Sequence, residues 1–119
     1  MKKLIVDLTK KELNHCVAKA QGWELVEGCW RDSTGTHLNQ YCSLTKGNTY
    51  RPTTNPAQWA ELIEKFDMYL NKGKPYWWAK VGGAYSGFRH IQGKTPSIAI
   101  CRAVVASVYG EYVEVSDES

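Results

Sequence analysis

The segment from Thr95 to Gly110 constrains the fold most, because helix signals mark both of its ends. Thr95 is a capping residue, and Pro96 takes the first-turn position where a missing N–H is tolerated. Apolar residues then recur at helical spacing before a glycine: Ile98, Cys101, Val104, Val105 and Val108. The pattern predicts a helix over residues 96–109, which at 1.5 Å per residue is roughly 21 Å long, about the width of a small domain.

Two further helices are predicted earlier in the chain. Thr9 and Glu12 have the spacing of a capping box, which predicts a helix from about Lys10 to Gln21. Asn55 before Pro56 combines a capping side chain with a first-turn proline, so a second helix begins there. Aromatic and β-branched runs between turn residues predict short strands at 23–30, 40–45, 76–81 and 88–92.

A chain of 119 residues is long enough for one globular domain. We therefore predict a single α+β domain over residues 1–110, with three helices and a small, mainly antiparallel sheet. Residues 111–119 carry four acidic side chains and no base, and are predicted to form an acidic tail.

The charge is unevenly distributed along the chain. Residues 1–110 carry a net charge of +7 and residues 111–119 a net charge of −4. A basic domain favours anionic partners without choosing among them, and a solvated surface with a slight basic excess explains the same numbers. No apolar run is long enough for a membrane span, and Asp7 interrupts the first one, which argues against a signal peptide. The expected compartment is the cytosol.

Catalytic and metal sites have little support in the sequence. His15 and Cys16 are consecutive, so on a helix their side chains diverge by about 100° and cannot act as a pair. The four cysteines lack a close C-x2-C pair, which argues against structural zinc and favours reduced, buried thiols. We predict a non-catalytic protein without a metal or cofactor.

Three blocks of the sequence carry a family resemblance. They are residues 8–22, residues 50–64 with Tyr50-x-Pro52-Thr53-Thr54-Asn55, and residues 92–107 with Gln92-Gly93-x-Thr95-Pro96. In order and spacing these blocks resemble the NinX-like proteins of tailed bacteriophages, a family with a domain of unknown function. Between Asn55 and Leu62, where the family pattern has a Trp and a Gly-Gly-Pro, this chain has Pro56-Ala57-Gln58-Trp59-Ala60-Glu61. The resemblance implies a phage protein acting in the cytoplasm of the host bacterium, and it implies no activity.

Candidate ligand-binding residues lie at two helix starts and among the aromatic residues. The starts before Pro56 and at Pro96 offer backbone amides and hydroxyls at the positive end of a helix dipole, although plain helix capping, the favoured interpretation, explains every hydroxyl without a ligand. Five Trp and seven Tyr against two Phe provide rings that stack on bases or fill a core. The candidates are Tyr50, Thr53, Thr54, Asn55, Trp59, Trp77, Trp78, Thr95, Ser97 and Arg102.

These features lead to one preferred function and two alternatives. The preferred function is binding of a small anionic, nucleotide-like ligand, with sequestration of a host antiviral defence signal as its purpose. This hypothesis requires the two helix starts and one or more rings to meet around a shared concavity. The alternatives are a module that binds a host or phage protein, with a homo-oligomer also open, and a single-stranded nucleic-acid binder, which the acidic tail disfavours.

Overall fold

The computed structural model describes residues 2–42, 50–82 and 91–115. Within these ranges the helices are α1 (Lys10–Ala20), α2 (Pro56–Lys65) and α3 (Pro96–Tyr109), with a short 3-10 helix η1 (Ile5–Asp7). The strands are β1 (Lys2–Leu4), β2 (Glu24–Val26), β3 (Cys29–Arg31), β4 (His37–Cys42), β5 (Met68–Lys72), β6 (Trp77–Val81), β7 (Ile91–Gly93) and β8 (Tyr112–Glu114). The α+β class and the three predicted helices are confirmed.

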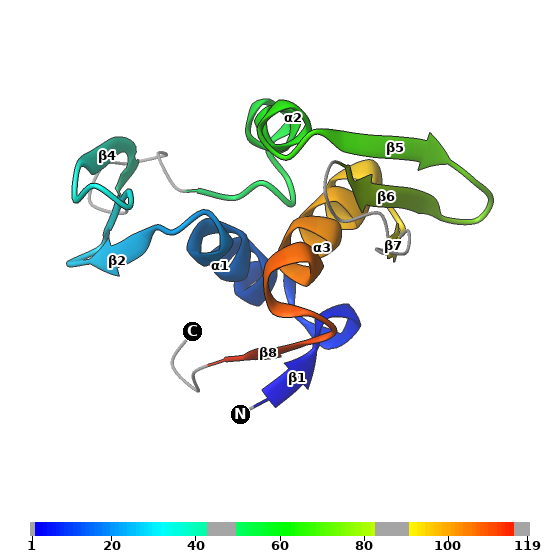
Figure 1. The fold of residues 1–119 in the computed structure, drawn as a ribbon, viewed down its shortest axis with the longest axis horizontal. Coiled ribbons are helices and arrows are strands. Elements are labelled where there is room, and N and C mark those ends of the chain that lie inside the picture. The colour runs from blue at the N-terminus through cyan, green and yellow to red at the C-terminus, as the bar shows by residue number, and fades with distance from the viewer. Residues whose placement is uncertain (1, 43–49, 83–90, 116–119) are drawn as a thin grey trace.

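Helix α3 is the centre of the molecule. It lies between the β5–β6–β7 sheet and the β1–β8 ribbon, and it contacts α1 and α2 as well (Figure 1). Ile100, Val104 and Val105 are fully buried, because a helix surrounded by other elements is apolar on most of its circumference. Gly93 lets β7 approach this helix closely, since a Cβ there would lie 2.4 Å from the Ala99 nitrogen.

The strands form three separate antiparallel sheets, β1–β8, β2–β3–β4 and β5–β6–β7. The prediction of one strand over residues 23–30 is wrong, because Glu27 and Gly28 turn the chain between β2 and β3. Both residues have positive φ, 51° and 81°, which is the conformation of a tight hairpin turn. Residues 43–45 of the strand predicted at 40–45, and residues 88–90 of the strand predicted at 88–92, lie outside the described residues.

The first part of the predicted acidic tail belongs to the folded body. Tyr112–Glu114 pairs with β1, placing Leu4 opposite Tyr112 and Lys2 opposite Glu114. Val113 and Val115 are buried on this ribbon. The ribbon therefore holds the beginning of the chain, including η1, against the end of α3.

The start of α1 is fixed by the predicted capping box. The Thr9 Oγ1 accepts from the Glu12 amide at 3.1 Å, and a Glu12 carboxylate oxygen accepts from the Thr9 amide at 3.0 Å. Lys3 adds an ion pair of 2.9 Å, and together the Thr9 amide and Lys3 lower the pKa of Glu12. These contacts set the position of Lys10, the first residue of α1.

The cysteines divide into two groups. Cys16 and Cys101 are free and buried, as expected for reduced thiols, and burial raises the pKa of Cys101 to about 12. Cys29 is disulfide-bonded, so the expectation of reduced thiols is wrong for this residue. It lies in β3 opposite Cys42 of β4, where the antiparallel register brings two backbones close together.

Candidate functional site

The starts of α2 and α3 lie next to each other. The Ser97 hydroxyl, in the first turn of α3, donates a buried hydrogen bond of 2.7 Å to the carbonyl oxygen of Thr53. The Thr53 amide in turn donates to Asn14 Oδ1 of α1 at 3.0 Å. The expected proximity of the two starts is therefore observed, and a direct hydrogen bond from Ser97 to Thr53 joins them.

The side chains of Thr95, Ser97 and Asn55 at the two starts are already paired, whereas the buried Thr53 Oγ1 has no hydrogen-bond partner among the described residues. Ser97 has one hydroxyl hydrogen and gives it to Thr53, so in the 3.0 Å contact between Thr95 and Ser97 it is Thr95 that donates. At the other start, Asn55 Oδ1 accepts from the amides of Ala57 and Gln58. These hydrogen bonds cap the two helices, and a bound anion would have to break them to reach the same donors.

The candidate aromatic side chains differ in their exposure to solvent. Tyr50 is buried, and its hydroxyl accepts from Gln21 Nε2 at 2.8 Å. Trp59 and Trp77 are half-buried against the core. Trp78 is 38% exposed on the opposite face of its strand, and its indole packs over Gly73, where a Cβ would lie 2.9 Å from Nε1. Of the predicted rings, Trp78 is the one open to a ligand.

A groove beside α3 brings positive charges together. Its volume is about 530 Å³, and it runs from η1 and the start of α1 to β7 and the first turns of α3. We call it the cationic groove, and its lining residues are Val6, Leu8, Lys10, Tyr76, Gln92, Lys94, Thr95, Ile98 and Arg102. This set contains three cations and, among the described residues, no carboxylate. Two of the predicted ligand-binding residues, Thr95 and Arg102, line it.

Arg102 spans the groove from wall to wall. One guanidinium nitrogen donates to the Gln92 carbonyl of β7 at 3.0 Å, and another donates to the Val6 carbonyl of η1 at 3.3 Å. Its Nε is buried and finds no hydrogen-bond partner among the described residues. Burial lowers the pKa of Arg102 and the carboxylate of Asp7 raises it, yet a guanidinium stays protonated at any ordinary pH. Neutral carbonyls therefore hold a full positive charge at this position.

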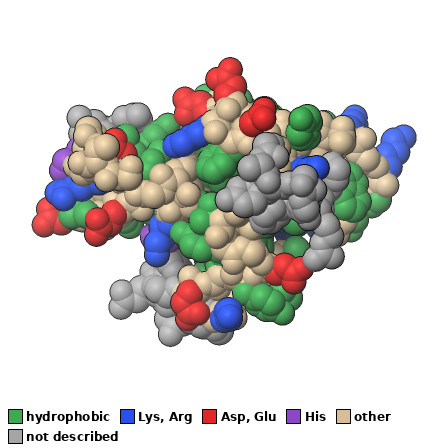
Figure 2. All heavy atoms as spheres, viewed as in Figure 1, with side chains coloured by type: hydrophobic (Ala, Val, Ile, Leu, Met, Phe, Trp, Pro, Cys, Tyr) green, Lys and Arg blue, Asp and Glu red, His purple; other side chains and the backbone are tan. Residues whose placement is uncertain are grey.

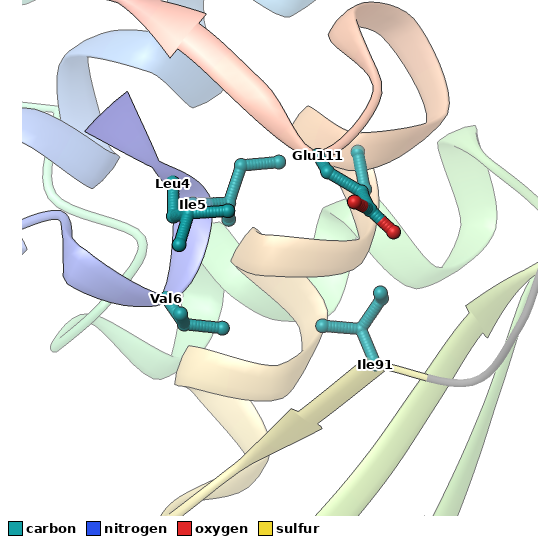
Figure 3. A pocket seen from close by; sticks show the side chains of 6 residues that line it. Leu4, Ile5, Val6, Ile91 and Glu111 are labelled. Atoms are coloured by element: carbon teal, nitrogen blue, oxygen red, sulfur yellow. The ribbon is translucent and has the colours of Figure 1, made fainter. Parts of the chain in front are cut away.

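An apolar pocket lies beyond Arg102 along the same helix. Its volume is about 300 Å³, and aliphatic side chains surround it with one acidic residue, Glu111, at the rim (Figure 3). We call it the apolar pocket, and its lining residues are Leu4, Ile5, Val6, Ile91, Ala106 and Glu111. Val6 belongs to both cavities, so the pocket and the cationic groove adjoin.

The predicted site and the observed cavities overlap in part. The remaining predicted residues at the start of α2, Thr53, Thr54 and Asn55, do not line either cavity, and neither does Ser97. Sequence reasoning did not select Lys10, Tyr76 or Gln92 for the groove, nor any residue of the apolar pocket. One sequence signal marked Gln92, because it is a polar residue directly after the apolar Ile91 and so points to the opposite face of its strand. In the sheet register it stands opposite the exposed Trp78.

A family comparison decides where this chain belongs. The family model described as Bacteriophage P22, NinX matches residues 5–108, which is most of the chain. The chain belongs to the NinX family. The three blocks that carried the resemblance all fall within this match, so the phage assignment is confirmed. No curated protein matches the chain at a significant level.

For this NinX-family chain, the described residues offer few other sites. Groups of three or more His, Cys, Asp or Glu side chains able to hold a metal ion are not found among them. His15 lies against the Trp30 ring, with centroids 5.1 Å apart, and burial lowers its pKa. Within the described ranges, no helix is long and apolar enough to cross a membrane. Among the described residues of this NinX-family chain, the cationic groove and the apolar pocket are two cavities to which a function can be attached.

Proposed function

We propose that this phage protein binds a small phosphate-bearing anion, nucleotide-like in size, in the cationic groove. The observation that carries the proposal is the convergence of Lys10, Lys94 and Arg102 on one groove with no described carboxylate in its lining. Phosphate oxygens accept hydrogen bonds from such cations, and a guanidinium offers several donors in a fixed geometry. The local charge is positive, so an anion lowers the free energy of the site.

The size of the groove favours a small molecule over a polymer. A volume of about 530 Å³ falls in the usual range for small-molecule sites. On the face of the molecule seen in Figure 2, positive and negative side chains alternate and do not gather into one continuous patch. A long nucleic acid requires a continuous positive track, and this face does not provide one.

The groove favours binding without chemical conversion. Its described lining holds no His, Cys, Asp or Glu, which are the usual acid–base and nucleophilic groups. Cys16 is buried, and burial raises its pKa, so its thiol stays protonated. For a protein of phage origin inside an infected bacterium, holding such a ligand without turning it over removes a host defence signal from solution.

Calorimetric titration with a panel of cyclic, linear and ADP-ribose-type nucleotides, together with pyrophosphate, tests the proposal. We expect binding heat at protein concentrations of about 100 μM, weakening as salt is added. Lys10→Gln and Lys94→Gln remove exposed groove cations and should each weaken binding severalfold. Lys11→Gln is the matched control, because Lys11 is an exposed neighbour of Lys10 outside the groove.

Two results decide between sequestration and other roles. Mass spectrometry of the ligand after incubation should return it unchanged. Absence of binding heat across the panel would contradict binding in the groove. Equal losses of affinity in Lys10→Gln and Lys11→Gln would contradict it as well. A ligand recovered as a cleaved product would contradict the non-catalytic role.

A protein-binding function is the second candidate, and one observation favours it. Leu4 and Tyr112 stand directly opposite each other in the β1–β8 ladder, and both are exposed, at 36% and 49%. Adjacent exposed apolar side chains of this kind mark interfaces with a host protein, a phage protein or a second copy of the chain. Pull-down from lysate and analytical ultracentrifugation test this function. It is supported if Tyr112→Ser loses a stoichiometric partner or a dimer that the control variant Tyr69→Ser retains.

A further inference from the structure

The lining of the cationic groove combines positive charge with carbon surface. Besides its three cations, it contains four residues that present apolar groups, which are Val6, Leu8, Tyr76 and Ile98. An inorganic phosphate would engage the cations and leave these apolar groups in contact with water, whereas covering them lowers the free energy of the complex. A ligand that suits the whole groove, with its volume of about 530 Å³, therefore has an apolar part next to its phosphate.

Tyr76 is the aromatic residue in the described lining of the groove. It is partly exposed and directly precedes β6, and its carbonyl oxygen accepts from the Gly73 amide at 3.0 Å. The next residue, Trp77, is paired on both sides, with Lys72 of β5 and with Gly93 of β7. The backbone that carries the ring is thus fixed before any ligand arrives, so holding the ring against a ligand costs little conformational entropy.

The ring and two of the cations come together at one end of the β6–β7 pair. Trp77 stands opposite Gly93 as the last pair of this ladder. Tyr76 comes immediately before this pair on β6 and Lys94 immediately after it on β7, so both leave the ladder at the same end. Arg102 donates to the β7 carbonyl oxygen two residues before Lys94. Paired Cα atoms on antiparallel strands are about 5 Å apart, so an aromatic ring lies beside two positive charges.

Resting on the proposed function, we propose that the ligand of the cationic groove is a nucleoside phosphate whose base stacks on the ring of Tyr76. Its phosphate lies at Lys94 and Arg102, and one sugar connects it to the base. Every nucleobase has a flat face that stacks on an aromatic ring, whatever hydrogen-bonding groups its edge carries. Tyr76 therefore distinguishes nucleotides from sugar phosphates and inorganic phosphates, and it does not distinguish one base from another.

Titrations with AMP, ribose 5-phosphate and pyrophosphate test this assignment. AMP and ribose 5-phosphate share the sugar and the phosphate, and they differ in the base. We expect the wild type to bind AMP about tenfold more tightly than ribose 5-phosphate, because base–aromatic stacking contributes by that order. Tyr76→Leu should abolish this preference and leave the affinity for pyrophosphate unchanged. Tyr76→Phe keeps the ring and should keep the preference.

A matched control and a measurement on the wild type complete the experiment. Tyr69→Leu removes an exposed tyrosine of β5, in the same sheet but outside the groove lining, and should keep the preference. Thermal melts verify that the variants fold. In the wild type, the aromatic NMR signals of Tyr76, assigned by comparison with Tyr76→Phe, should shift on addition of AMP and stay in place on addition of ribose 5-phosphate.

The outcomes separate this inference from the proposed function. Pyrophosphate binding together with equal affinities for AMP and ribose 5-phosphate overturns the inference and leaves anion binding intact. A preference for AMP that persists in Tyr76→Leu, or that Tyr69→Leu loses as well, overturns the role of Tyr76. Unchanged Tyr76 signals at saturating AMP overturn that role too. If none of the three compounds binds, both the inference and the proposed function fail.

Discussion

The Ser97 hydroxyl lies 2.7 Å from the carbonyl oxygen of Thr53 and donates to it within the protein interior. This bond fastens the first turn of α3 to the segment that leads into α2. Thr95 donates to Ser97 in turn, so a chain of two hydroxyls ends on one backbone carbonyl. Groups that looked from the sequence like donors for a ligand instead stabilise the junction of two helices.

Replacing Ser97 with alanine should destabilise the protein. The substitution leaves the buried Thr53 carbonyl without its donor, and an unsatisfied buried polar group costs about 1–3 kcal/mol. Urea unfolding should show this loss in the free energy of unfolding. Thr54→Ala is the control, since Thr54 is exposed and its hydroxyl makes only a 3.5 Å contact with the Arg51 carbonyl. Equal effects of the two substitutions would contradict the assigned role of Ser97.

Replacing Thr53 with valine should leave stability unchanged or raise it by about 1 kcal/mol. The Thr53 Oγ1 is buried and has no hydrogen-bond partner among the described residues. Valine has nearly the same shape, so it removes an unpaired polar atom without opening a cavity. Thermal denaturation of the variant checks this expectation. A marked loss of stability would show that the hydroxyl has a partner, for example a bound water.

Replacing Arg102 with lysine should lower the free energy of unfolding by about 1–3 kcal/mol. The guanidinium reaches the Val6 and Gln92 carbonyls on opposite walls of the groove, and one ammonium group cannot copy that fork. Hydrogen exchange should report the loss locally, with faster exchange in η1 and β7 than in β2 and β3. Unchanged exchange in η1 and β7 would show that Arg102 does not hold the walls.

His15 should make stability depend on pH in the weakly acidic range. Burial against Trp30, with a smaller contribution from Lys19, lowers the pKa of His15 below its ordinary value of 6.5. As the pH falls through that value, the unfolded chain binds a proton before the folded one does. The stability present above pH 6.5 therefore declines on acidification until the folded pKa is passed.

The difference between the wild type and His15→Gln isolates this effect. Chemical unfolding at a series of pH values should show a smaller decline for the variant than for the wild type as the pH is lowered. The other histidines are retained in both proteins, so the difference between the two curves comes from His15. Parallel curves would contradict a lowered pKa for His15.

Local sequence signals predicted the helices well because caps act within one turn. Thr9 with Glu12, Asn55 with Pro56, and Thr95 with Pro96 each fix a helix start through contacts three residues apart or fewer. The hairpin at Glu27 and Gly28 was missed, because a glutamate with positive φ is rare and carries no turn signal. The ribbon of β1 and β8 joins strands from distant parts of the chain, and such long-range pairing is not encoded in periodicity.

The candidate site was predictable only where its residues are close in sequence. Thr95 and Arg102 were selected because they belong to one helix and its cap. Lys10 and Tyr76 reach the same groove from distant parts of the chain, so their roles appear only once α1 and β6 have packed around α3. The roles expected of Thr53 and Ser97 as ligand contacts stay untested, and their observed hydrogen bonds serve the interior.

The pairing of β1 with β8 has a consequence for biosynthesis. Lys2–Leu4 leaves the ribosome before Tyr112–Glu114 does, so β1 cannot form its backbone hydrogen bonds until β8 has been synthesised. η1, which follows β1 directly, lines both the cationic groove and the apolar pocket. A nascent chain that already has α1, α2 and the β5–β6–β7 sheet therefore still lacks the β8 strand that holds this wall in place, and the two cavities are complete only after β8 has been synthesised and paired.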